Sequence, residues 1–398
     1  MKKKFPDDQN SPTATDHIGS DSADEYGIPT TEADEERAFQ VASQWQLIWW
    51  KFRKHKLAVV GGVVTVLIYL VAIFAEFLAP FSPTVTASRY TYAPPQRLHL
   101  FIEDEAGRRF SPHMKGYTVE IERAALRRVY TVDETVIIPV RFLVRGEPYK
   151  LAGLFPAERR LFGPVDQDQP MYFFGADRLG RDILSRVIHG TRISMSVGLI
   201  GVFLSLFLGI LLGGLAGYYG GWVDNLQQRT GEFLESIPAI PLWMGLAAAI
   251  PTTVTPLQVY FLITVILSVI GWTGVARVVR GKFLSLKTED FVMAARFDGM
   301  SDYRVVMRHM VPNFMSHIIA VVTITIPNMI LAETALSFLG VGLRPPIVSW
   351  GVLLQEAQNV RTVATAPWLL LPGLAVVIAV LSLNFFGDGL RDAADPYV

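Results

Sequence analysis

The chain has 398 residues, of which 51% are hydrophobic and only 18% are charged, whereas a soluble domain has about 25% charged residues. The charges are unevenly placed, because residues 236–276 contain no Asp, Glu, Lys or Arg. A membrane-spanning helix needs roughly 20 apolar residues, so this run is long enough for two. The composition indicates a polytopic membrane protein. The absence of cysteine excludes disulfides, thiol nucleophiles and cysteine-ligated metal sites. The net charge of zero argues neither for nor against nucleic acid, and we expect no nucleic-acid partner.

Residues 1–44 form a polar, acidic segment with ten acidic and four basic residues and no apolar stretch of the signal-peptide kind. Such a composition predicts a disordered tail. Two interpretations remain open, a docking segment for a partner and a solvated extension without a specific role.

Six apolar segments predict six membrane-spanning helices. The first covers about 57–78, within an entry region 45–81 whose Trp, Lys and Arg residues are typical of the cytoplasmic end of a span. The others are predicted at 193–219, in the two halves of 236–276 on either side of a turn at 250–256, at 314–336 and at 362–386.

The distribution of basic residues predicts the orientation. Residues 277–313 carry seven basic and four acidic residues. On the opposite side, the connection 250–256 carries no basic residue and the connection 340–361 carries two. Because short cytoplasmic connections are enriched in Lys and Arg, both termini are expected in the cytoplasm. The segment 80–192 is too long for the rule to apply to it.

The long connection between the first two spans is therefore expected outside. Residues 82–170 are interpreted as a small β-rich insert, with strands at 131–138 and 139–144 and a turn at 146–148. A packed cap and a receptor-docking surface are both open roles. His99 and His113 have no partners at metal-ligand spacing, so a membrane-anchored enzyme lacks a catalytic constellation here.

The second predicted span carries a small residue at every fourth position. A helix places such residues on one face, where a neighbouring backbone can approach closely. The alternative is a glycine-rich apolar segment without a specific contact. The residues are Gly201, Ser205, Gly209, Gly213 and Gly217.

Ionisable residues are rare in the predicted spans. Glu76 and Glu333 lie near outer ends and His317 near an inner end, whereas proton- or sodium-coupled carriers usually place acids near mid-membrane. This pattern weakens the hypothesis of a stand-alone secondary carrier. The stretch GVARVVRGKF (274–283) has the wrong glycine spacing for a phosphate-binding loop. We therefore expect no cofactor, metal or catalytic residue, and any ATP-driven step belongs to another chain.

Residues 287–313 predict a cytoplasmic helical hairpin. Thr288 is the expected N-cap of the first helix, Gly299 its left-handed C-terminal residue, and Ser301 the cap of a second helix that Pro312 stops. An apolar stripe on the second helix is predicted from residues at positions i, i+3, i+4, i+7 and i+8, namely Tyr303, Val306, Met307, Met310 and Val311. The plainer interpretation is an amphipathic hairpin lying on the membrane surface.

The hairpin sequence AARFDGMSDYRVVMRHMVPN resembles the EAA loop of bacterial ABC-importer permeases. Ala294, Ala295, Gly299 and Pro312 match its anchor positions, while Met293 replaces the usual Glu and Val311 the usual Leu. Further motifs resemble the C-type subunit of the dipeptide, oligopeptide and nickel permeases. They are FFGADRLGRDILSRVIHGTRISMSVG (173–198), YYGGWVD (218–224), AETALSFLGVGLRPPIVSWG (332–351) and NFFGDGLRDAADP (384–396). The resemblance covers residues 45–83 and 171–398, and the insert is larger than the usual connection.

The resemblance implies an all-α, six-span type I ABC-importer permease of the bacterial inner membrane, with a five-helix core at 171–398. Its expected partners are a second, B-type permease subunit, two ABC ATPase subunits, an extracytoplasmic substrate-binding protein and membrane lipid. Its substrates would be peptides or similar small solutes, and the sequence does not specify which. The implied ATPase-coupling residues are Ala294, Ala295, Arg296, Asp298, Gly299, Ser301, Arg308, His309 and Pro312.

Overall fold

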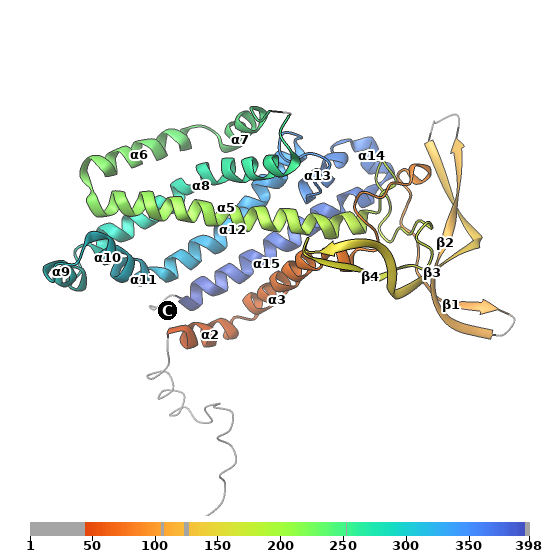
Figure 1. The fold of residues 1–398 in the computed structure, drawn as a ribbon, viewed down its shortest axis with the longest axis horizontal. Helices are drawn as coiled ribbons and strands as arrows, with labels where there is room; N and C mark the ends of the chain where they lie inside the picture. The colour runs from red at the N-terminus through yellow and green to blue at the C-terminus, as the bar shows by residue number, and fades with distance from the viewer. Residues whose placement is uncertain (1–43, 105–106, 123–126, 252, 395–398) are drawn as a thin grey trace, which may run out of the picture. The chain divides into compact units, whose positions relative to one another are not determined.

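The computed structural model describes residues 44–104, 107–122, 127–251 and 253–394 (Figure 1). The predicted N-terminal tail lies almost entirely outside these residues. Long apolar helices and one four-stranded antiparallel sheet make up the described fold. Five helical segments of the described residues are long and apolar enough to cross a membrane. They are Lys56–Ile73, Ile183–Tyr219, Pro256–Leu286, Val321–Phe338 and Pro367–Ala394.

The first span follows a short helix, α2 (Gln44–Lys54), and consists of α3 (Lys56–Ile73) continued by one turn, α4 (Ala75–Leu78). The side chain of His55 caps α3 by accepting the N–H of Ala58 at 3.1 Å. The predicted range 57–78 agrees with these helices, apart from an interruption at Phe74.

The second span, α5 (Ile183–Tyr219), starts ten residues earlier than the predicted 193. Asp182 caps it, with Oδ2 accepting the N–H of Ser185 at 2.7 Å. The predicted start is too late because Arg186 and Arg192 look incompatible with a span. Both are paired in the structure, with Asp177 and Glu76 respectively, so neither charge is left unpartnered.

Six spans are predicted, but only five helices of the described residues are long and apolar enough to cross a membrane. The predicted third span, in the first half of 236–276, contains only the short helix α7 (Ala239–Ala248), which follows α6 (Gly221–Ser236) after a break at Pro238. Ten residues of helix extend about 15 Å, half of the roughly 30 Å hydrocarbon core, so α7 is too short to span alone. The next helix, α8 (Pro256–Leu286), starts with a capping box formed by Thr255 and Gln258.

The predicted hairpin consists of α9 (Asp290–Phe297), α10 (Asp302–Val305), a π-helical turn η2 (Val306–Met310) and α11 (Val311–Asn313). It leads into α12 (Met315–Phe338), which contains Pro327.

The last span differs from its predicted range of 362–386. Residues 350–370 form four short helices, α13 (Trp350–Leu354), η3 (Gln355–Gln358), α14 (Val360–Thr365) and η4 (Pro367–Leu370), and α15 (Leu371–Ala394) follows. The interruption has a local cause, because Ala366 precedes Pro367 and adopts a non-helical φ of −136°.

The insert contains a short helix, η1 (Ser88–Tyr90), and a sheet in the order β1-β2-β3-β4. The strands are β1 (His99–Asp104), β2 (Gly107–Glu122), β3 (Arg127–Leu151) and β4 (Phe155–Pro164). The two predicted strands are parts of β3, and the predicted turn at 146–148 is wrong. That position is a register shift inside the β3–β4 ladder. The side chain of Arg160 packs against Gly146, where a Cβ would lie 2.8 Å from its Nε.

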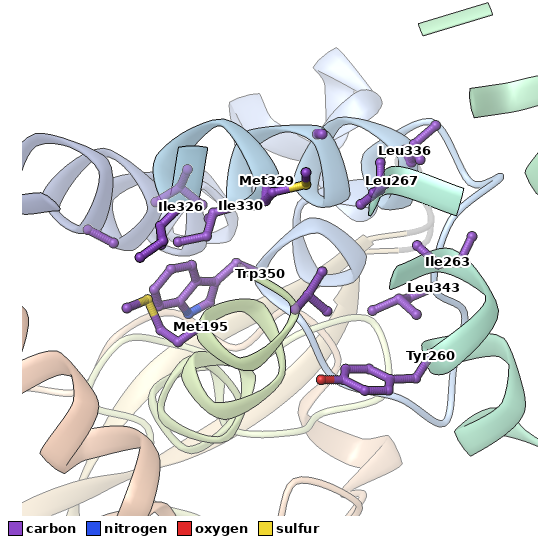
Figure 2. Close-up of a cluster of buried hydrophobic side chains, with 14 of the residues drawn as sticks. Met195, Tyr260, Ile263, Leu267, Ile326, Met329, Ile330, Leu336, Leu343 and Trp350 are labelled. Atoms are coloured by element: carbon purple, nitrogen blue, oxygen red, sulfur yellow. The ribbon is translucent and has the colours of Figure 1, made fainter. Parts of the chain in front are cut away.

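A buried apolar cluster joins α5, α8, α12, α13 and α15. Trp350 lies next to Met195 in this cluster and faces Ile326 and Ile330 (Figure 2). Its indole N–H donates to the carbonyl of Val187 at 3.2 Å. The start of α13 is thereby fixed against α5.

Candidate functional site

Gly299 ends the first helix of the hairpin in the way its position requires. Its φ is +75°. Its N–H donates to the carbonyl of Arg296 at 3.0 Å, and the N–H of Met300 donates to the carbonyl of Ala295 at 3.2 Å. These two bonds define a Schellman motif, with Asp298 as the C-cap. The turn between the hairpin helices therefore depends on a left-handed residue.

The predicted cap of the first helix is wrong. Glu289, not Thr288, is the N-cap of α9, and the Thr288 hydroxyl donates to the carbonyl of Ser285 at 3.0 Å. The reason is that α8 continues to Leu286. Thr288 is therefore used to satisfy the end of that helix.

The second helix of the hairpin begins at the predicted cap but does not end where predicted. Ser301 occupies the N-cap position, but only its carbonyl contributes, accepting the N–H groups of Arg304 and Val305. Pro312 does not stop the helix, which continues to Asn313. The π-helical turn precedes the proline, with the N–H of Val311 donating to Val306. A wider turn relieves the contact that a proline ring makes with the carbonyl four residues before it.

This π turn also explains why the predicted apolar stripe is partly wrong. Val305 and Met310 are fully buried, whereas Tyr303 is 76% exposed and Met307 is half exposed. A regular 3.6-residue period does not place positions 305 and 310 on one face, but a wider turn does.

The two faces of α9 have different environments. Val292 and Ala295 are buried in a cluster with Phe283 and Phe314, so this face packs against the chain itself. Ala294 is exposed, as are Met293 and Phe297, and Phe297 is 90% exposed. Of the two alanines in the motif, Ala294 is therefore the one available to a partner.

Tyr218, at the end of α5, joins the parts of the hairpin. Its hydroxyl donates to the carboxylate of Asp302 and accepts from Nε of Arg296 at 3.1 Å. Its carbonyl accepts from Nζ of Lys287 at 2.7 Å. Helical spacing does not single out Tyr218, and its only sequence signal is the YYGGWVD motif. The contacts connect the hairpin directly to the longest helix.

The remaining predicted coupling residues lie near the turn and on the second helix. Asp298 and Arg308 are exposed, and His309 is partly buried. Within the described residues, Nε2 of His309 has no hydrogen-bond partner.

The small residues of α5 all lie on the face that meets α8. A Cβ at Gly209 would lie 2.4 Å from Val275, and one at Gly213 would lie 2.3 Å from the carbonyl oxygen of Ala276. One at Gly217 would lie 2.6 Å from Phe283. The hydroxyl of Ser205 donates to the carbonyl of Ser268, and the hydroxyl of Ser268 donates to the carbonyl of Gly201. The two backbones could not approach this closely with larger residues.

The motif at 173–198 forms a buried charged cluster at the opposite end of α5. The carboxylate of Asp177 accepts from Nε of Arg181 at 2.6 Å and pairs with Arg186. Burial raises the pKa of Asp182 to about 7. Burial and the nearby Asp177 also raise the pKa of Glu356, which pairs with Arg178. These groups hold the start of α5 against η3.

Glu333 is fully buried in the second half of α12. Its carboxylate accepts from the hydroxyls of Ser337 and Ser349, both at 2.8 Å, and of Ser194 at 3.2 Å. The serines come from α12, the N-cap of α13 and α5. The carboxylate therefore links three elements rather than facing a pathway.

His99 and His113 are paired across β1 and β2, with ring centroids 5.4 Å apart. Sequence spacing does not bring them together. No group of three metal-ligating side chains occurs among the described residues.

Two family models match the chain. Residues 209–398 match "Binding-protein-dependent transport system inner membrane component", and residues 43–95 match "N-terminal TM domain of oligopeptide transport permease C". The strands of the insert lie between these ranges.

Named relatives resemble the chain over more than half of its length. It is 38% identical to the oligopeptide transport system permease protein OppC of Haemophilus influenzae, covering 56% of this chain and 70% of that protein. The Escherichia coli K12 OppC is 40% identical, covering 56% and 72%. The Bacillus subtilis dipeptide transport system permease protein DppC is 36% identical, covering 56% and 68%. A chain of the MetNI methionine ABC transporter in an inward-facing conformation is 20% identical, with a TM-score of 0.41 and coverage of 54% and 98%.

Proposed function

Because the chain belongs to the family of binding-protein-dependent transport system inner membrane components, we propose that it forms half of the translocation pathway of an ATP-driven importer. It is a permease subunit of the peptide-importer type, and its relatives are named for oligopeptide and dipeptide transport. Its substrates are peptides or similar small solutes.

The partners of the chain in this proposal are those of its family. A second, B-type permease subunit completes the pathway, two ABC ATPase subunits supply the energy, and an extracytoplasmic binding protein delivers the substrate. The chain itself catalyses no reaction, and ATP is hydrolysed on the ATPase subunits.

The hairpin at 287–313 is the contact with an ATPase subunit. The observation that carries this step is the division of α9 into a buried face and an exposed apolar face at Met293, Ala294 and Phe297. An aromatic side chain that is 90% exposed on a rigid helix suits a protein interface better than water. Asp298, the C-cap of α9, follows Phe297 directly, and Arg308 and His309 on the second helix are assigned to the same contact.

The proposed orientation places both termini and the hairpin in the cytoplasm. The basic residues of 277–313 support it. The end of α15 lies at the same end of the bundle, because Gly387 packs against Thr323 in the first half of α12, and Gly389 packs against Ala58 at the start of α3. The sheet follows α4 and is then extracytoplasmic.

The hairpin transmits movement because its internal contacts make it rigid. The Schellman turn fixes α9 relative to α10, and Tyr218 ties both to the end of α5. Closure of the ATPase dimer displaces the hairpin, and ATP supplies the difference in affinity between inward- and outward-open states.

A charge on the exposed face of α9 tests the docking step. Phe297→Asp should abolish most binding-protein-stimulated ATP hydrolysis and uptake, because a buried carboxylate at the interface would have no partner. The variant should still insert, since Phe297 makes few contacts within the chain. The measurement uses the complete transporter in liposomes that contain ATP.

Tyr303→Asp is the matched control, an exposed aromatic residue on the neighbouring helix. It should retain coupling. Wild-type hydrolysis and uptake by the Phe297 variant would contradict the docking step and favour a hairpin that lies on the membrane. Uptake that persists without ATP would indicate a secondary carrier instead.

A further inference from the structure

The hairpin between β3 and β4 ends in an exposed apolar tip. The N–H of Leu154 donates to the carbonyl of Leu151 at 3.0 Å, and the turn residues Ala152 and Gly153 have φ values of +51° and +76°. Leu154 is 74% exposed and Phe155 is 67% exposed. The tip therefore presents two large apolar side chains beyond a tight turn, and both are mostly exposed among the described residues.

The tip lies beside the outer end of the first span. Nη1 of Arg160 donates to the carbonyls of Ala79 at 2.9 Å and Glu76 at 3.4 Å. Both β3 and β4 contact α4, and in Figure 1 β4 lies next to the end of α3. These contacts fix the hairpin to the end of the first span through the side chain of a buried arginine.

The length of the first span gives the depth of this contact. The 18 residues of α3 extend about 27 Å, close to the roughly 30 Å hydrocarbon thickness. Glu76, one turn further, is therefore at the outer boundary of the hydrocarbon. Exposed apolar side chains precede Glu76 along the chain. They are Leu70 and Ile73 on α3 and Phe74, the N-cap of α4. The tip continues this lipid-exposed surface outward.

The charges on the hairpin complement a phospholipid surface. Between residues 141 and 160, five basic side chains accompany two acidic ones. Arg145 pairs with Glu158, while Lys150 and Arg159 are exposed next to the tip. Long basic side chains reach phosphate groups while neighbouring apolar residues enter the interface.

We propose that the tip Leu151–Phe155 inserts into the outer interface of the bilayer and anchors the extracytoplasmic sheet to lipid beside the first span. Lipid is favoured over a protein partner because two side chains are far smaller than the ~800 Å² per partner of a stable protein interface. The anchor would hold the sheet at a fixed height above the membrane.

The absence of cysteine allows a direct test. A nitroxide is attached to Phe155→Cys in the complete transporter, assembled with cysteine-free partners in phospholipid nanodiscs, and its accessibility to oxygen and to a water-soluble nickel chelate is measured. Oxygen partitions into lipid, so the ratio of oxygen to nickel accessibility should be several-fold higher at this site than at Phe110→Cys. Phe110, on β2, is 65% exposed and thus a matched control.

Leu154→Cys provides a second labelling position at the tip and should behave like Phe155→Cys. Nickel accessibility equal to that of the Phe110 label would place the tip in water and overturn the proposal. An immobile label shielded from both reagents would mean that protein covers the tip, which also overturns it. The readout does not depend on transport, so its failure is distinguishable from failure of the proposed function.

Discussion

Asp182 is a buried carboxyl group in an environment very different from water. It caps α5 through Oδ2, whereas Oδ1 has no partner among the described residues. Burial raises its pKa to about 7, from a value near 3.9 in an unfolded chain. The folded state therefore binds a proton more tightly than the unfolded state.

A pH dependence of stability follows. Between pH 4 and pH 7, roughly the interval between the unfolded and folded pKa values of Asp182, the folded state gains stability as the pH falls. Thermal unfolding of the detergent-solubilised transporter should shift to a higher temperature on lowering the pH from 8 to 5.5. The raised pKa of Glu356 acts in the same direction.

The comparison with Asp182→Asn isolates this residue, because asparagine is an equally good N-cap and does not titrate. The variant should show a smaller pH-dependent shift than the wild type. Equal shifts would mean that other groups determine the pH dependence.

At the scale of an element, the close contact between α5 and α8 depends on the glycines of α5 that pack directly against the backbone of α8. A Cβ at Gly213 would lie 2.3 Å from a carbonyl oxygen of α8, which cannot move without displacing the helix. A Cβ at the adjacent Gly214 would lie 3.4 Å from the ring of Phe283, an ordinary contact. Gly213→Ala should therefore destabilise the bundle by about 1–3 kcal/mol.

Gly214→Ala is the control and should be neutral or slightly stabilising, because alanine favours the helix by up to about 1 kcal/mol. Heat-induced aggregation of the two variants in detergent measures the difference. Equal stability would mean that α5 and α8 can separate without loss, and the small residues would then have no packing role.

Sequence reasoning succeeds where an element is determined locally. The uncharged run of α8 and the apolar segments of α3 and α12 agree with helices because length and composition alone indicate them. The failures occur where distant contacts decide. The start of α5 depends on Arg186 and Arg192 being paired with distant carboxylates.

The hairpin shows the same limit. The positive φ of Gly299 follows from its place after a short helix. The π turn, by contrast, changes which residues face inward, and no periodic pattern reveals it. Phe297 and Tyr218 are also missed, since exposure and a bond to a distant helix are properties of the fold.

At the scale of the whole described fold, α5 connects the hairpin at 287–313 with the buried charged cluster at the start of the helix. Its 37 residues extend about 55 Å. One end holds Tyr218 against the hairpin, and the other begins at the buried cluster around Asp177 and Asp182. Ser194 links the same helix to Glu333. We therefore expect a displacement of the hairpin to reach the opposite end of the bundle through one continuous helix.

Tyr218→Phe tests this connection. The change removes the hydroxyl that bridges Arg296 and Asp302 while retaining the aromatic ring, and the loss of two hydrogen bonds to charged groups is worth about 1–3 kcal/mol. The hairpin should still bind the ATPase subunits, but its movement should no longer be transmitted fully to α5. Uptake should fall more than ATP hydrolysis, so the measured quantity is the number of substrate molecules transported per ATP. Tyr219→Phe, at an adjacent and exposed tyrosine, should leave that ratio unchanged. If both variants keep the wild-type ratio, the hairpin moves α5 by a route that does not include the Tyr218 hydroxyl, and the covalent connections through α8 and α12 are sufficient.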